Sequence, residues 1–136
     1  MAGADSIQSK VRDWKYRTGW TLSGLAILFL AMDAVMKLLA LPVVIEAGTA
    51  LGFGGESTAR LLGVILMGCT VLYALPRTSL LGAILLTGYL GGAVATHVRV
   101  ANPLFSHVLF GVYVGVFVWA GIYLRDPRLR ILIPTR

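Results

Sequence analysis

The chain has 136 residues, of which 57% are hydrophobic and only 13% are charged. A soluble domain carries about 25% charged residues, so this composition excludes an ordinary soluble fold and predicts a small membrane protein in a lipid bilayer. The net charge is +6, and the basic residues flank apolar runs, which argues against nucleic-acid binding. The single cysteine, Cys69, excludes an internal disulfide and a thiolate metal cage.

Residues 1–18 form a basic segment ahead of the first apolar run. Ile7, Val11 and Trp14 recur there at helical spacing between Lys and Arg residues. This pattern predicts a short helix lying in the membrane interface, and the alternative is a frayed basic tail. The segment has no apolar core followed by a small-residue cleavage site, so we expect no cleavable signal peptide and a retained first span.

Four apolar runs predict an all-α fold, a four-transmembrane-helix bundle in one membrane domain covering residues 1–136. Pro42 ends the first run and Pro76 ends the second, while Asn102-Pro103 has the pattern of an N-cap followed by proline at the first helical position. Residues 42–57 are too short to span and predict an extracytoplasmic interfacial segment with a short helix. The predicted transmembrane helices cover 19–41, 58–75, 80–98 and 104–124, and a basic cytoplasmic tail covers 125–136.

The placement of Lys and Arg predicts the orientation of the bundle. With four spans, both termini and the 76–79 turn lie on one side of the membrane. That side holds nine basic residues and the other side three, so the positive-inside rule predicts cytoplasmic N- and C-termini. The nine are Lys10, Arg12, Lys15, Arg17, Arg77, Arg125, Arg128, Arg130 and Arg136, and the three are Lys37, Arg60 and Arg99.

Small residues recur in the third and fourth spans. The third contains Gly88-x-x-Gly91-Gly92 and the fourth contains Gly111-x-x-x-Gly115. Such faces let helix backbones approach closely in a membrane, so we expect these glycines to pack the bundle.

With this orientation, the polar residues of the spans and the interfacial segment gather in the outer half of the membrane. Asp33 and Lys37 are four residues apart and share one helix face. A charge near the bilayer centre costs about 3 kcal/mol on insertion scales. The two side chains therefore either neutralise each other, with Lys37 snorkelling outward, or provide a desolvated carboxylate that exchanges a proton or holds a polar group of a substrate.

The histidines and the remaining charges have similar alternatives. His97 and His107 are either ordinary hydrogen-bonded interfacial residues or acid–base groups. Haem or metal ligation has less support because the residues lack a tight ligand spacing, so we expect no metal site. Arg99 either snorkels to the interface or binds an anionic or carbonyl group. Glu46 is either solvated without a role or, beneath the open end of the bundle, pairs with Lys37 or Arg99.

Several short motifs resemble the DoxX-like family of small membrane proteins over about residues 24–124. They are Lys37-Leu-Leu, Pro42-Val-Val-Ile-Glu46, Leu51-Gly-Phe, Leu62-Gly63, Leu75-Pro-Arg77, Leu81-Gly-Ala83 and Gly92-Ala-x-x-x-His97. The resemblance implies a four-helix integral protein associated with quinone-linked or thiol-related oxidoreductase systems. With the charge bias, it implies the cell inner membrane. The chain departs from some relatives at Leu66, where they place a glutamate.

We therefore expect a small subunit that binds a quinone or another apolar ligand in the outer half of the bundle and is linked to membrane redox chemistry. Electrons would come from a membrane or cytoplasmic redox partner. One alternative is a non-redox acid–base enzyme on a lipid-like substrate, and another is a non-catalytic binding or assembly protein, including a homo-oligomer. The candidate catalytic residues are Asp33, His97 and His107, and the candidate ligand-binding residues are Lys37, Glu46 and Arg99.

Overall fold

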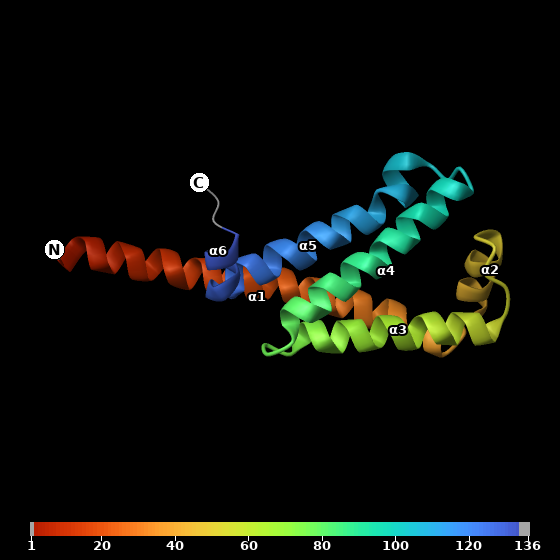
Figure 1. The fold of residues 1–136 in the computed structure, drawn as a ribbon, viewed down its shortest axis with the longest axis horizontal. Helices are drawn as coiled ribbons and strands as arrows, with labels where there is room; N and C mark the ends of the chain where they lie inside the picture. The colour runs from red at the N-terminus through yellow and green to blue at the C-terminus, as the bar shows by residue number, and fades with distance from the viewer. Residues whose placement is uncertain (1, 134–136) are drawn as a thin grey trace.

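The computed structural model describes residues 2–133, which form helices joined by short turns, with no strand in that range (Figure 1). This confirms the all-α prediction. The helices are α1 (Ala2–Leu38), α2 (Pro42–Ala50), α3 (Glu56–Ala74), α4 (Ser79–Arg99), the π-helical segment η1 (Leu104–Val108), α5 (Phe110–Arg125) and α6 (Pro127–Leu132).

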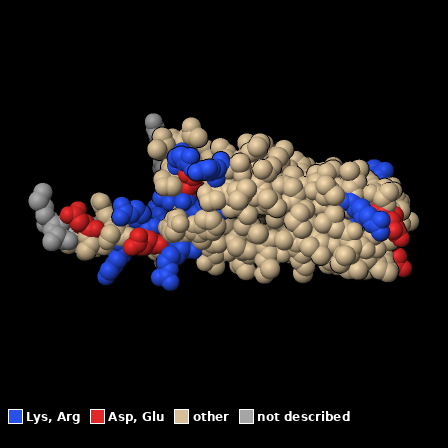
Figure 2. All heavy atoms as spheres, turned by 90° about the horizontal axis from the view of Figure 1, so that it is seen from below, with Lys and Arg blue, Asp and Glu red and all other residues tan. Residues whose placement is uncertain are grey.

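Four stretches are long and apolar enough to cross a bilayer, as the sequence predicts. They are Asp5–Leu38, Glu56–Ala74, Ser79–Arg99 and Leu104–Arg125. The prolines act as expected, since Pro42 is the first residue of α2 and Pro76 lies in the turn between α3 and α4. Figure 2 shows a broad belt without Lys, Arg, Asp or Glu between two charged ends, and the blue atoms gather mainly at the end where α1 begins.

The four long helices pack as a bundle with α1 and α4 on one diagonal. α1 packs against α3 and α5, and α4 packs against the same two helices. The core they enclose is apolar and includes Leu30, Leu66, Leu86 and Ile122, each at most 2% exposed. In Figure 1, α3 and α4 diverge from their turn toward the end that carries α2.

The bundle is closed at the end that carries the α3–α4 turn and α6. A Cβ atom on Gly82 would lie 2.2 Å from the backbone nitrogen of Tyr73, and one on Gly121 would lie 2.5 Å from Ser23 Oγ. The Tyr73 hydroxyl, which is fully buried, donates a hydrogen bond of 2.7 Å to the Val118 carbonyl and lies 3.0 Å from Ser23 Oγ. Helix backbones therefore touch at this end, and the hydroxyls of Tyr73 and Ser23 are hydrogen-bonded between them.

Arg125 completes the closed end, although its position in the sequence predicts that it belongs to the basic tail. It is the last residue of α5 and only 6% exposed. Its guanidinium lies 4.4 Å from the ring centroid of Trp20 and 4.9 Å from that of Tyr73, and its Nη2 donates a 2.8 Å hydrogen bond to the Tyr73 carbonyl. Stacking on two aromatic rings lets this charge enter the bundle.

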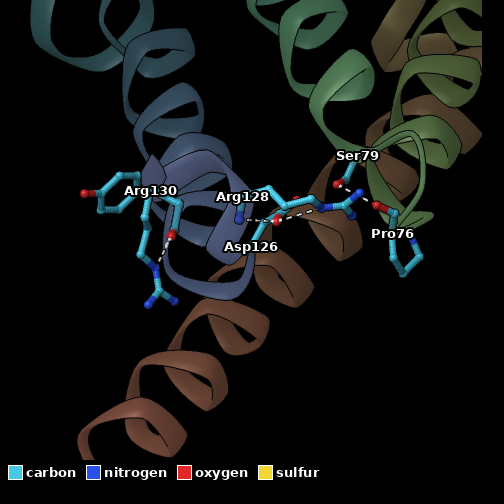
Figure 3. A network of polar contacts seen from close by, with 6 residues as sticks. Pro76, Ser79, Asp126, Arg128 and Arg130 are labelled. Carbon is cyan, nitrogen blue, oxygen red and sulfur yellow. Dashed lines mark hydrogen bonds and ion pairs between the residues drawn. The ribbon is translucent and has the colours of Figure 1, made fainter. Parts of the chain in front are cut away.

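The residues after Arg125 form α6, folded back against the closed end. Asp126 caps this helix by accepting a 2.9 Å hydrogen bond from the Arg128 backbone nitrogen, and Arg130 Nε donates to the Tyr123 carbonyl at 3.1 Å (Figure 3). Figure 3 also shows the Arg128 side chain extending toward the α3–α4 turn at Pro76 and Ser79. Arg136 lies outside the described residues.

The basic N-terminal segment and the first span form one unbroken helix, α1, where the sequence pattern predicts a separate interfacial helix or a frayed tail. The 37 residues of α1 measure about 55 Å, compared with a hydrocarbon core of about 30 Å. The first part of α1 therefore projects beyond the other helices, as Figure 1 shows. Ile7 and Trp14 on this part are 64% and 65% exposed.

Candidate functional site

A cavity of about 620 Å³ occupies the half of the bundle opposite the closed end. Its walls come from α1, α2, α3, α4, η1 and α5, so every long helix contributes to it. Small-molecule sites in proteins have volumes of about 300–1,000 Å³ and are mostly apolar with a few polar groups. Asp33, Lys37, His97 and His107 line this cavity among apolar side chains, so its size and lining are those of a ligand site.

Gly88 and Gly92 of α4 help to make the cavity instead of packing against another helix. A Cβ atom on Gly88, Gly91 or Gly92 would meet nothing within 4 Å, and Gly88 and Gly92 line the cavity. The packing prediction is therefore wrong for these residues. It is correct for Gly111, whose added Cβ would lie 3.1 Å from the Leu90 carbonyl oxygen. A small-residue face leaves a void wherever no backbone comes close to fill it.

Asp33 and Lys37 form the ion pair that their spacing predicts. Lys37 Nζ lies 2.5 Å from Asp33 Oδ1 and 2.5 Å from Oδ2. The side chains are 20% exposed for Lys37 and 33% exposed for Asp33. Because each charge neutralises the other within the cavity wall, a ligand meets a strong dipole there without a net charge.

His97, near the end of α4, and His107, in η1, lie on either side of the turn after α4, and their side chains come together. Their ring centroids are 5.9 Å apart with an angle of 56° between the ring planes. Each ring uses Nδ1 for a local contact, His97 with Asn102 Nδ2 at 2.8 Å and His107 with Ser106 Oγ at 2.7 Å. Neither Nε2 has a hydrogen-bond partner within residues 2–133, so both remain free to contact a ligand.

The backbone at the end of α4 positions Asn102 beside His97. Ala101 has φ 55°, its nitrogen donates to the Val98 carbonyl at 3.0 Å, and the Asn102 nitrogen donates to the His97 carbonyl at 3.1 Å. This is the pair of hydrogen bonds that defines a Schellman motif at a helix C-terminus. The N-cap prediction for Asn102 is wrong, because η1 follows Pro103 without a side-chain cap and the Asn102 side chain contacts His97 instead.

Helix α2 covers the cavity at the open end. Val43, Val44 and Ile45 line it, and no residue of α2 is fully buried. Arg99 lies outside the lining, and its Nη2 donates a 2.6 Å hydrogen bond to the Leu51 carbonyl, which joins the end of α4 to the end of α2. Arg99 therefore holds the cover in place through the backbone.

Glu46 lies apart from the other candidate residues. It is exposed on α2 and does not line the cavity. Among residues 2–133 it has no ion pair with Lys37 or Arg99, because Lys37 pairs with Asp33 and Arg99 bonds to the backbone. Within the same residues, no three His, Cys, Asp or Glu side chains gather as a metal site.

Four apolar helices, a closed end and a covered cavity define a small polytopic membrane protein with an internal ligand-sized space. The model of the DoxX-like family matches residues 21–121, and the chain belongs to that family. The resemblance seen in the sequence motifs is thereby confirmed. No curated protein and no solved structure matches the chain.

Proposed function

We propose that this DoxX-like protein binds an apolar carbonyl-bearing molecule of the quinone class in the cavity, as a small subunit linked to membrane redox chemistry. The observation that supports this most directly is the composition of the cavity wall. A flat apolar ring fits about 620 Å³ of largely apolar space, and its two oxygens find polar partners at the imidazoles of His97 and His107 and at the Asp33–Lys37 pair.

In this proposal the protein handles the protons of the reaction and a partner protein supplies the electrons. Reduction of a quinone takes two electrons and two protons. Asp33, His97 and His107 are groups that can pass protons to or from the bound ring, and Lys37 stabilises negative charge on a ring oxygen. The electrons come from a membrane or cytoplasmic redox partner, in keeping with what the family resemblance implies.

We also propose that both termini face the cytoplasm and that the cavity lies in the outer half of a cell inner membrane. The support is the gathering of basic residues at the closed end, which orients membrane proteins toward the cytoplasm (Figure 2). A Cys69→Ala background allows a labelling test with an impermeant maleimide. Thr49→Cys on α2 should react in intact cells, whereas Ser6→Cys on α1 should react only after permeabilisation. The reverse pattern would overturn the orientation.

The binding proposal is tested by filling the cavity. Purified protein in lipid nanodiscs is titrated with naphthoquinone, and a lipid extract of the same preparation is analysed by mass spectrometry for a retained quinone. Gly92→Leu places a side chain into the cavity without a backbone clash, because a Cβ atom there meets nothing within 4 Å. We expect its affinity for naphthoquinone to fall by at least about tenfold, which corresponds to about 1.4 kcal/mol.

Gly91→Leu is the matched control for this test. Gly91 is the neighbouring residue on α4, its added Cβ also meets nothing within 4 Å, and it does not line the cavity. The control should bind naphthoquinone like the wild type. Equal binding by both variants would place the ligand elsewhere and refute the proposal.

The lipid extract also separates the alternatives. A retained lipid-like ester or other hydrolysable substrate in place of a quinone would favour the acid–base enzyme, with Asp33 and His97 exchanging protons. Wild-type protein that carries no ligand and binds no naphthoquinone would favour the non-catalytic assembly protein. In that case the oligomeric state and co-purifying proteins become the measurements of interest.

A further inference from the structure

The contact between Asn102 and His97 bears on which ring nitrogen of His97 carries the proton. Asn102 Nδ2 lies 2.8 Å from His97 Nδ1. An amide nitrogen only donates hydrogen bonds, so Nδ1 must be the acceptor in this contact. A neutral imidazole that accepts at Nδ1 has its proton on Nε2. His97 therefore carries an N–H donor at Nε2.

The backbone keeps this arrangement from rotating away. Asn102 is tied to His97 twice, through the side-chain contact and through its own backbone nitrogen, which donates to the His97 carbonyl at 3.1 Å. The left-handed conformation of Ala101 between them closes the Schellman motif that makes both contacts possible. The amide is thus part of the helix terminus and is pre-organised before any ligand arrives.

We propose that Asn102 is a positioning residue that makes the cavity select a carbonyl oxygen over a hydroxyl group at His97. This inference rests on the proposed function, because it names the form of the ligand that the site prefers. The ring of His97 lines the cavity, and its Nε2–H has no acceptor within residues 2–133. A quinone oxygen, which only accepts hydrogen bonds, is the matching partner.

The second histidine differs in this respect. His107 Nδ1 lies 2.7 Å from Ser106 Oγ, and a hydroxyl can either donate or accept. His107 can therefore exchange its donor and acceptor nitrogens, whereas His97 cannot without breaking the Asn102 contact. A hydroxyl oxygen can also accept from the Nε2–H of His97, but its own proton then finds no acceptor on that ring. The site at His97 therefore favours the oxidised ligand, and a reduced ring bearing hydroxyl groups is held less tightly.

The test replaces the amide of Asn102, which donates to His97, with a carboxylate of nearly the same shape, which only accepts. In Asn102→Asp the carboxylate only accepts, so His97 must place its proton on Nδ1 and present a bare Nε2 to the cavity. Wild type and variant in nanodiscs are titrated with naphthoquinone and with a naphthol of the same ring size, at a mildly alkaline pH that leaves His97 neutral and the naphthol hydroxyl protonated. We expect the ratio of naphthoquinone to naphthol affinity to fall by about tenfold in the variant.

Nitrogen NMR of the His97 imidazole provides a second readout that does not depend on ligand binding. The wild type should carry its proton on Nε2, and the variant should carry it on Nδ1. A wild-type ring protonated on Nδ1, or an affinity ratio unchanged in Asn102→Asp, would overturn the inference. If the wild type binds neither probe, the proposed function fails, while the NMR result still decides the protonation site.

A double variant controls for the added negative charge. In a His97→Gln background, Asn102→Asp should leave the affinity ratio unchanged, because the ring through which it acts is gone. A ratio that still falls in this background would mean that the carboxylate acts on the ligand directly, and this would also overturn the inference.

Discussion

Removing the charge of Asp33 tests how much the ion pair contributes to folding. Asp33→Asn keeps the shape of the side chain but leaves Lys37 in an apolar wall beside a neutral amide. Exposed ion pairs contribute about 0–1 kcal/mol, and breaking a buried pair costs about 3–5 kcal/mol. The side chains are 20% and 33% exposed, nearer the buried case, and both carboxylate oxygens contact Nζ. We therefore expect a loss of about 2–3 kcal/mol.

The assay is reversible unfolding of the purified protein in mixed micelles, with Lys37→Met and the double variant Asp33→Asn/Lys37→Met measured beside it. Lys37→Met should cost a similar amount, because it leaves the carboxylate unpaired. The double variant should recover to within about 1 kcal/mol of the wild type, since a neutral polar group beside an apolar one needs no counter-charge.

The outcome distinguishes the two interpretations of this pair. A double variant that recovers stability and also binds naphthoquinone would show that the pair is structural only. Recovered stability with lost binding would assign the charges to the ligand. Single variants that lose less than about 0.5 kcal/mol, with additive effects in the double variant, would refute the reasoning that the pair is coupled within the membrane.

Three further predictions concern the closed end and the cover. Gly82→Ala should lower the free energy of unfolding by at least about 2 kcal/mol in the same assay, because the new Cβ meets the Tyr73 backbone, whereas Gly91→Ala on the same helix should not destabilise. Tyr73→Phe should cost about 1–3 kcal/mol because it leaves Ser23 without its buried partner, and equal unfolding curves would contradict this. Arg99→Met should speed hydrogen exchange in α2, measured by mass spectrometry, with little change in global stability; unchanged exchange would mean that the bond to the α2 terminus is dispensable.

The spans and the ion pair are predictable from the sequence because local rules decide them. A bilayer requires about 20 apolar residues in each helix, and Pro42 and Pro76 restrict where helices continue, so the predicted limits of the second, third and fourth spans fall within a few residues of those observed. The start of the first span does not agree, because the basic segment before residue 19 belongs to the same helix α1. The spacing of Asp33 and Lys37 places them on one face of any regular helix, so their contact follows from the helix alone.

Other features depend on contacts that local patterns do not encode. Asn102-Pro103 satisfies the pattern of an N-cap, but the Schellman motif turns the amide toward His97, which precedes it by five residues. In the sequence, Arg125 is one of several basic residues that follow the fourth span, and nothing nearby in the sequence predicts its burial. The neighbouring rings of Trp20 and Tyr73, which are distant in sequence, make that burial favourable. Gly92 would pack a helix if one came close, and the divergence of the bundle leaves it facing open space.

The contrast between the two ends of the bundle decides how a bound molecule comes and goes. At one end the backbones touch, so a molecule that enters the cavity cannot pass through and must leave by the way it came. Exchange is then governed by the leaflet beside α2, where an apolar compound is concentrated by partitioning far above its level in water. For the apolar ligand proposed above, a modest intrinsic affinity would be enough to keep the cavity occupied, with the lipid phase as its reservoir.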